Sequence, residues 1–161
     1  MNRSPFHLVQ LNIARMRAPL DDPIMAEFVA GLERVNALAE RSPGFVWRLQ
    51  TDEGDATALR VFDDEMIIVN MSVWESIEAL REFVYRSDHV KVLRQQAKWF
   101  EPMQEASLVM WWINAGDLPT VEEAKARLEH LREHGPTEQA FSFRKPFDPP
   151  REPPVESALA Q

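Results

Sequence analysis

The chain has 161 residues, of which 45% are hydrophobic and 27% are charged, and its formal net charge is −8. This length suits one domain with a substantial core, and an acidic balance without a basic stripe argues against nucleic acid as a partner. The sequence contains no cysteine, which excludes disulfides and thiolate chemistry, and no apolar run near the roughly 18 residues of a membrane span, so no membrane partner is expected.

The first part of the chain predicts a strand, a helix and a second strand. Residues 6–13 alternate in the way that is typical of a half-buried strand. An acidic cap with a proline in the first turn begins a helix at 21–23, and Ser42-Pro43-Gly44 ends it. Residues 45–50 predict the second strand, and the polar stretch 51–65 predicts a long hairpin loop.

The rest of the chain repeats this order and adds one more helix. Residues 66–73, rich in Ile and Val, are the most β-like segment. They lead into a helix with inward apolar residues at helical spacing, and a break at 87–88 precedes a further helical stretch. Residues 107–113 predict the fourth strand. The stretch 120–123 has the form of a capping box and opens a charged helix that ends at 135–136.

The order β-α-β-β-α-β predicts the fold class. It is typical of an α+β, ferredoxin-like fold, in which two helices cross one face of an antiparallel sheet. A C-terminal helix follows in this chain. We expect the domain to cover residues 1–145, and the proline-rich tail over 146–161 to be extended or disordered.

Two-residue periodicity places a polar set of side chains on one face of the sheet. If the aliphatic side of each strand faces the two helices, the remaining face carries Gln10, Asn12, Arg48, Asn70 and Ser72. The fourth strand adds either Trp111 or Trp112. Such a face is either solvated or the wall of a pocket or interface. Amides, one arginine and large apolar neighbours favour the second, because solvated faces usually carry Lys and Glu.

An uncovered face of this composition predicts a partner. A monomer would expose large apolar groups to water, so we expect the sheet of a second copy to cover the face in a homodimer. A small molecule is the other expected partner. Residues 1–10 lack the charged-then-apolar pattern of a signal peptide, so a cytoplasmic location is expected.

The second predicted helix carries the densest polar group. Tyr85, Arg86 and His89 share one side of the helix if it continues through the break at 87–88. His89 could move a proton or ligate a metal or a heme iron, and Arg86 could hold a carboxylate or an oxyanion. The alternative is a buried hydrogen-bond cluster that joins the two helical segments.

Two further groups have a functional and a structural interpretation. Arg48 could anchor an anionic ligand, or it could form a salt bridge across the dimer interface. The stretch His130–His134 matches the H-x-x-E-H pattern of zinc proteases. It lies in the last turn of a charged helix with no evident third ligand, so we interpret it as a solvated helix end.

Several stretches resemble the family known as domain of unknown function 3291, in order and to about Phe147. They are His7–Asn12, Asn36–Arg48, Ser72–Ser76, Phe83–His89, Trp99–Phe100, Leu108–Gly116 and Gly135–Phe143. That family resembles the dimeric α/β-barrel superfamily, which includes antibiotic-biosynthesis monooxygenases. The resemblance implies a dimer with a pocket between sheet and helices, and it does not imply one reaction.

We therefore expect a small-molecule enzyme of monooxygenase-like type. Its predicted catalytic residues are Tyr85, Arg86 and His89. The predicted ligand-binding residues are Gln10, Asn12, Arg48, Asn70, Ser72, Trp111 and Trp112. The cofactor is left open: heme ligated by His89 is one variant, and no other metal is predicted. The alternative function is a non-catalytic small-molecule-binding or dimeric interaction protein.

Overall fold

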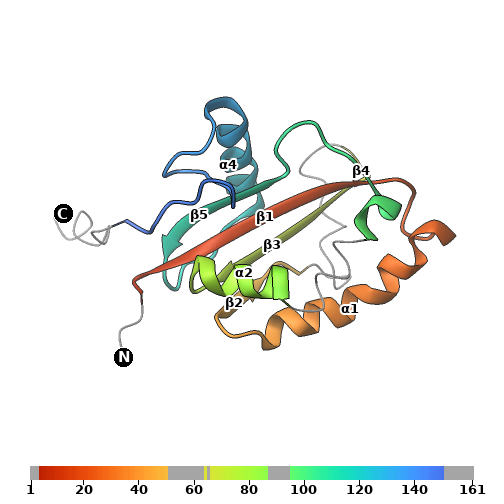
Figure 1. Cartoon of the computed structure of the whole chain (residues 1–161), viewed down its shortest axis with the longest axis horizontal. Helices are drawn as coiled ribbons and strands as arrows, with labels where there is room; N and C mark the ends of the chain where they lie inside the picture. The colour runs from red at the N-terminus through yellow and green to blue at the C-terminus, as the bar shows by residue number, and fades with distance from the viewer. Residues whose placement is uncertain (1–3, 51–63, 65, 87–94, 151–161) are drawn as a thin grey trace.

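The structure is a computed structural model that describes residues 4–50, 64, 66–86 and 95–150. The predicted loop over 51–65 lies largely outside them, and the predicted break at 87–88 lies wholly outside. The elements are β1 (Phe6–Met16), the 3-10 helix η1 (Pro23–Met25), α1 (Ala26–Arg41), β2 (Phe45–Arg48), β3 (Ile67–Trp74), α2 (Ile77–Arg86), β4 (Phe100–Glu101), β5 (Leu108–Asn114) and α4 (Val121–His134) (Figure 1). No helix of the described residues is both long and apolar enough to cross a bilayer.

β1 is the central strand of an antiparallel five-stranded sheet. β3 pairs with one edge of β1 and carries β2 on its outer side, while β5 and the short β4 pair with the other edge. The long strands therefore lie in the order β2-β3-β1-β5, with the first and third strands of the chain in the middle. This arrangement confirms the predicted α+β, ferredoxin-like fold.

Side-chain caps begin the helices where the sequence predicts starts. The Asp22 carboxylate accepts a hydrogen bond from the Ile24 amide at 3.0 Å and caps η1. The Ser76 hydroxyl accepts from the Ala79 amide at 3.0 Å at the start of α2. At α4, the Thr120 hydroxyl accepts from the Glu123 amide at 3.1 Å, as the predicted capping box requires.

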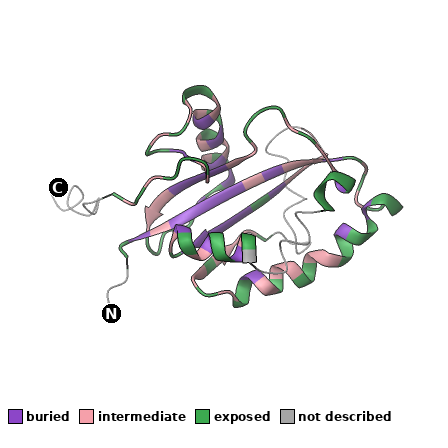
Figure 2. Ribbon diagram, in the orientation of Figure 1, coloured by how far each residue is buried: buried purple, intermediate pink, exposed green. Residues whose placement is uncertain are grey.

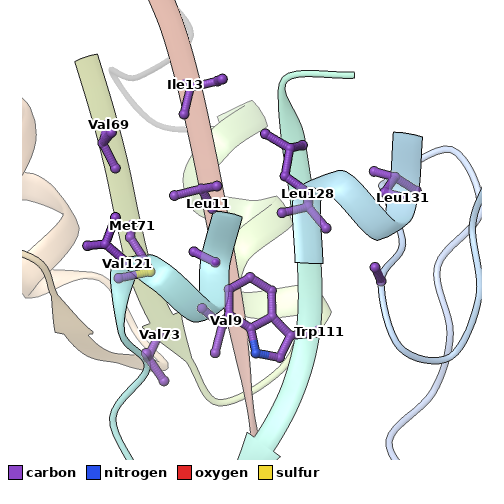
Figure 3. Packing of buried hydrophobic residues seen from close by; sticks show 13 residues of the cluster. Val9, Leu11, Ile13, Val69, Met71, Val73, Trp111, Val121, Leu128 and Leu131 are labelled. Atoms are coloured by element: carbon purple, nitrogen blue, oxygen red, sulfur yellow. The ribbon is translucent and has the colours of Figure 1, made fainter. Parts of the chain in front are cut away.

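The two faces of the sheet are covered by different helices, and the predicted assignment of faces was wrong. α1 and α2 cover the face that bears the polar set, where they pack against Leu8, Trp74 and Met110. The aliphatic face packs instead against α4 (Figure 3). The α4 side chains that cover it are Val121, Ala124, Leu128 and Leu131.

The aliphatic face is fully enclosed within the chain. Its central residues are Val9, Leu11, Val73, Val109 and Trp111, and none of them has exposed surface. Figure 2 shows β1 buried along most of its length, whereas α1 is exposed over its outer side. The predicted homodimer assumed one uncovered sheet face. Because helices of the same chain cover both faces, that assumption was wrong, and the homodimer itself stays a prediction.

The segment after α4 packs along the outer edge of β5. The backbone of Phe141 exchanges two hydrogen bonds with Met110, at 2.8 and 2.9 Å. The indole Nε1 of Trp112 donates to the Phe147 carbonyl at 2.9 Å. The segment therefore satisfies part of a strand edge that would otherwise be open to another chain, and the described packing reaches past Pro146 to Phe147.

An exposed ion-pair cluster joins three segments at one end of β1. The Arg15 guanidinium contacts Asp64 at 3.0 Å and Glu101 at 2.9 Å. The Met66 amide and Arg15 donate to the Asp64 carboxylate and lower its pKa. Because the pKa of Asp64 is lower in the folded chain than in the unfolded chain, this carboxylate stabilises the fold at pH values above its ordinary pKa. The contribution is lost as the pH falls through the lowered pKa of the folded chain.

Candidate functional site

A cavity of about 630 Å³ lies between the sheet and helices α1 and α2. The polar face of β1, β2 and β3 forms its floor, and α1, α2 and residues 95–100 form its walls. The family resemblance implied a pocket between sheet and helices, whereas the periodicity of the strands had placed the polar set on the face away from the helices. The apolar wall residues of the cavity include Phe28, Leu32, Val35, Phe45, Trp74, Phe83, Val84, Trp99 and Phe100.

The polar side chains of the floor form two rows across the strands. Arg48, Ser72 and Gln10 are register partners on β2, β3 and β1. Asn70 and Asn12 are the next partners on β3 and β1. Directly opposed Cβ atoms in such rows lie roughly 4.5–5.5 Å apart. The structure thus brings together the whole predicted polar set, and each member lines the cavity.

A directional hydrogen-bond network links the two rows. Gln10 Nε2 donates to Asn70 Oδ1 at 2.7 Å and to Ser72 Oγ at 2.9 Å, and Trp74 Nε1 donates to Ser72 Oγ at 2.8 Å. Gln10 and Ser72 are 6% and 7% exposed. The amide hydrogens of Gln10 are both used, and the Ser72 oxygen accepts twice. No described residue accepts the Ser72 hydroxyl hydrogen.

Arg48 is held at the edge of the floor by α1. Its Nε donates to Glu40 Oε2 at 2.7 Å, and the side chains are 17% and 44% exposed. The sequence left open a salt bridge across a dimer interface; the salt bridge that the structure shows lies within the chain. Because Glu40 binds only Nε, it orients the guanidinium and leaves the Nη atoms without an acceptor among the described residues.

Two groups of aromatic residues line the cavity. In one group the Trp74 ring stacks on Phe83 with centroids 5.3 Å apart and meets the edge of Phe45 at 5.4 Å. In the other group the Phe28 ring contacts Phe100 at 5.0 Å and Trp99 at 5.4 Å. The polar floor lies between these two apolar groups of rings.

Residues 7–157 match the family model described as "Domain of unknown function (DUF3291)". The chain belongs to this family. The resemblance stated from the sequence is thus confirmed.

Comparison of the DUF3291 chain with curated proteins found no match. Among solved structures it is similar to SnoaB, a cofactor-independent oxygenase from Streptomyces nogalater, at 19% identity and a TM-score of 0.46, over 70% of this chain and 95% of that one. It is also similar to NE2512, a protein of unknown function from Nitrosomonas europaea, at 11% identity and a TM-score of 0.44, over 72% and 97%. Likeness at this level concerns the fold and not the activity.

The two tryptophans predicted for the pocket of this DUF3291 protein lie elsewhere. Trp111 is on the aliphatic face, where the Arg127 guanidinium lies 5.7 Å from its ring. Trp112 shares the polar face, but its indole binds the Phe147 carbonyl and it does not line the cavity. Trp74 and Trp99 line the cavity instead. Trp74 follows Ser72 by two residues on β3, so the two side chains share one face of the sheet. The two-residue periodicity of the strand was enough to predict this.

The predicted catalytic group is only partly described. Tyr85 lines the cavity at its mouth, is 54% exposed, and meets the Phe143 ring at 5.8 Å. α2 ends at Arg86, whose side chain, like the whole of His89, lies outside the described residues. The role of the three residues stays a prediction.

The described part of the chain holds no complete set of side-chain ligands for heme iron or zinc. The described lining contains neither histidine nor cysteine, so heme coordination here would depend on His89. In the H-x-x-E-H stretch, His130 Nε2 lies 3.2 Å from the Thr137 hydroxyl. No group of three metal-ligating side chains occurs among the described residues.

Replacing Ser72 with alanine should lower the free energy of unfolding by about 1–3 kcal/mol, because the buried N–H groups of Gln10 and Trp74 lose their common acceptor. Urea denaturation followed by circular dichroism measures this loss. The matched control is Ser142→Ala, which removes a hydroxyl from a half-buried serine outside the network and should change stability by less than about 0.5 kcal/mol. Equal losses in both variants would contradict the network.

Proposed function

We propose that this DUF3291 protein binds a small, largely apolar molecule between its sheet and helices α1 and α2, and acts on it as a monooxygenase-like enzyme. One observation carries the proposal: a cavity of about 630 Å³ with aromatic residues in its walls lies over a floor of oriented polar groups. Small-molecule sites are typically cavities of about 300–1,000 Å³ with few, well-placed polar groups.

The floor supports the catalytic part of the proposal. The Ser72 hydroxyl and the Asn70 amide nitrogen are donors without acceptors among the described residues. Preorganised donors stabilise negative charge as it develops on a substrate oxygen. Within the predicted group of Tyr85, Arg86 and His89, we assign proton transfer to His89 and the binding of a carboxylate or an oxyanion to Arg86.

A second function is favoured by a specific observation. The described lining residues that titrate are Glu27, Arg34, Arg48 and Tyr85, and none of them belongs to β1 or β3 in the middle of the floor. A floor of amides and one hydroxyl orients a ligand without exchanging protons with it. The alternative is therefore a binding protein without catalysis.

Two measurements on one set of compounds separate these functions. Mono- and bicyclic phenols, ketones and acids are first tested for quenching of tryptophan fluorescence, since Trp74 and Trp99 line the cavity. Oxygen uptake is then recorded with and without NADPH, because monooxygenation needs two electrons, from the substrate or a reductant, to reduce the second oxygen atom to water. Binding with uptake supports the enzyme, binding alone supports the binding protein, and no binding contradicts the proposed function.

Filling the cavity should weaken binding without harming the fold. Gly31 on α1 lines the cavity, and a Cβ added there would meet no atom within 4 Å. It lies one turn from Phe28 and Val35 on the same helix face. Gly31→Phe should therefore weaken binding of any ligand found by the fluorescence test by about tenfold or more.

The stability of the same variants distinguishes a filled site from a damaged fold. Gly31→Ala should bind as the original chain does and gain about 0.5–1 kcal/mol of stability, because glycine is unfavourable inside a helix. Gly31→Phe should melt no lower than the original chain. Unchanged ligand binding by Gly31→Phe would place the ligand outside this cavity.

A further inference from the structure

The hydrogen-bond directions on the floor determine which kind of ligand atom can bind there. Gln10 Nε2 spends both hydrogens on Asn70 Oδ1 and Ser72 Oγ. Asn70 therefore points its amide N–H groups away from Gln10. The Ser72 oxygen also accepts from Trp74, so the remaining capacity of this buried hydroxyl is chiefly as a donor. The network thus leaves the Ser72 hydroxyl and the Asn70 amide nitrogen as donors for a bound molecule.

Arg48 adds the positive charge on the same row. It is the register partner of Ser72, and it lines the cavity with a side chain that is mostly buried. Glu40 accepts from Nε, and its side chain is more exposed than that of Arg48. Solvent therefore weakens the effect of the Glu40 charge on the guanidinium. The Nη atoms have no acceptor among the described residues. A guanidinium presents its free N–H groups in a fixed plane that matches the two oxygens of a carboxylate.

We propose that the ligand of this cavity is an apolar monocarboxylate, whose carboxylate oxygens accept hydrogen bonds from the Nη atoms of Arg48 and from the Ser72 hydroxyl. This inference rests on the proposed function. The rings of Phe45, Trp74 and Phe83 line the adjoining part of the cavity and receive the apolar body. A dianion such as a phosphate monoester would need a second cation. The row of Arg48, Ser72 and Gln10 holds one, and Arg34, the other arginine that lines the cavity, lies on α1 and already has a partner.

The test compares acids with neutral compounds of the same shape. The pairs are benzoate and benzamide, 2-naphthoate and 2-naphthamide, and dodecanoate and dodecanamide. Binding is measured at neutral pH by tryptophan fluorescence and by calorimetry. In at least one pair the acid should bind about tenfold or more tightly than the amide, because only the acid offers two acceptor oxygens and a negative charge to the Nη atoms of Arg48.

Variants of Arg48 test whether this residue causes the preference for acids over amides. In Arg48→Gln the acid and the amide should bind alike. In Arg48→Lys, which keeps the charge and loses the planar pair of donors, an intermediate preference is expected. The matched control is Arg41→Gln, which removes the same charge from an exposed arginine at the end of α1 and should keep the full preference. Circular dichroism checks that each variant is folded.

Each result decides between the two proposals. Equal binding of acid and amide in every pair would overturn the carboxylate inference and leave the small-molecule proposal standing. A preference for acids that persists in Arg48→Gln would overturn the assignment to Arg48. Failure of every compound in this set and in the phenol and ketone set would overturn the proposed function itself, and the carboxylate inference with it.

Discussion

Replacing Leu128 with alanine is expected to lower the free energy of unfolding by about 2–5 kcal/mol, which is the usual cost of truncating a buried leucine. Leu128 has no exposed surface, and it lies on α4 against Leu11 and its neighbours on the aliphatic face (Figure 3). Helix α4 contributes a short apolar stripe, so one lost side chain leaves a cavity that its neighbours cannot easily fill. Urea denaturation measures the loss.

The control for this variant is Leu118→Ala. Leu118 precedes α4 and is 58% exposed, so its truncation should change stability by less than about 0.5 kcal/mol. If Leu128→Ala also had so small an effect, α4 would not be packed on the sheet in solution. The aliphatic face would then be free for the sheet of a second copy, as a dimeric barrel requires.

Replacing Gly44 with alanine is expected to cost about 2–5 kcal/mol, through two effects that add. Gly44 has a φ of 86°, which disfavours any residue with a Cβ by roughly 1–2 kcal/mol. A Cβ at this position would also overlap the Cβ of Ala79 on α2, and overpacking typically costs about 1–3 kcal/mol. Gly44 connects α1 to β2, and its carbonyl accepts from the Glu75 amide at 2.8 Å, so the turn cannot move away freely.

Two further variants separate the backbone effect from the overlap. Gly116 has a φ of 98° and open space around it, so Gly116→Ala should cost only the backbone strain of roughly 1–2 kcal/mol. The double variant Gly44→Ala with Ala79→Gly should be more stable than the sum of the two single losses predicts, because it removes the overlap. Simple additivity would show that α2 does not approach the turn so closely.

The sequence predicts the order of elements well, because that order depends on local signals. Asp22, Ser76 and Thr120 mark helix starts through hydrogen bonds within a few residues. The choice of sheet face is not local. Periodicity separates the two faces of a strand, but it does not say which helix covers each one. The wrong choice came from leaving α4 out, although Val121, Ala124, Leu128 and Leu131 repeat at helical spacing.

The candidate site was predictable to a similar degree. The polar floor was found because five strand positions share one period, and each of these residues lines the cavity. The sequence allows Trp74 and Trp99 as walls of an aromatic pocket, but it favours core for them, because tryptophans at such positions are usually core residues. The pairing of Arg48 with Glu40 was also missed, since it joins a strand to the end of the preceding helix. Such pairs depend on tertiary packing.

The position of α4 in the chain affects how the protein is made. During synthesis β1 leaves the ribosome before its partner β5 and before α4, the helix that covers the aliphatic face. Until then the nascent chain carries Val9, Leu11 and Ile13 on a strand without its apolar cover. Unpaired strand edges and uncovered apolar faces promote aggregation. A chain truncated before Val121 would therefore keep its aliphatic face uncovered, and we expect it to be bound by chaperones or degraded by proteases.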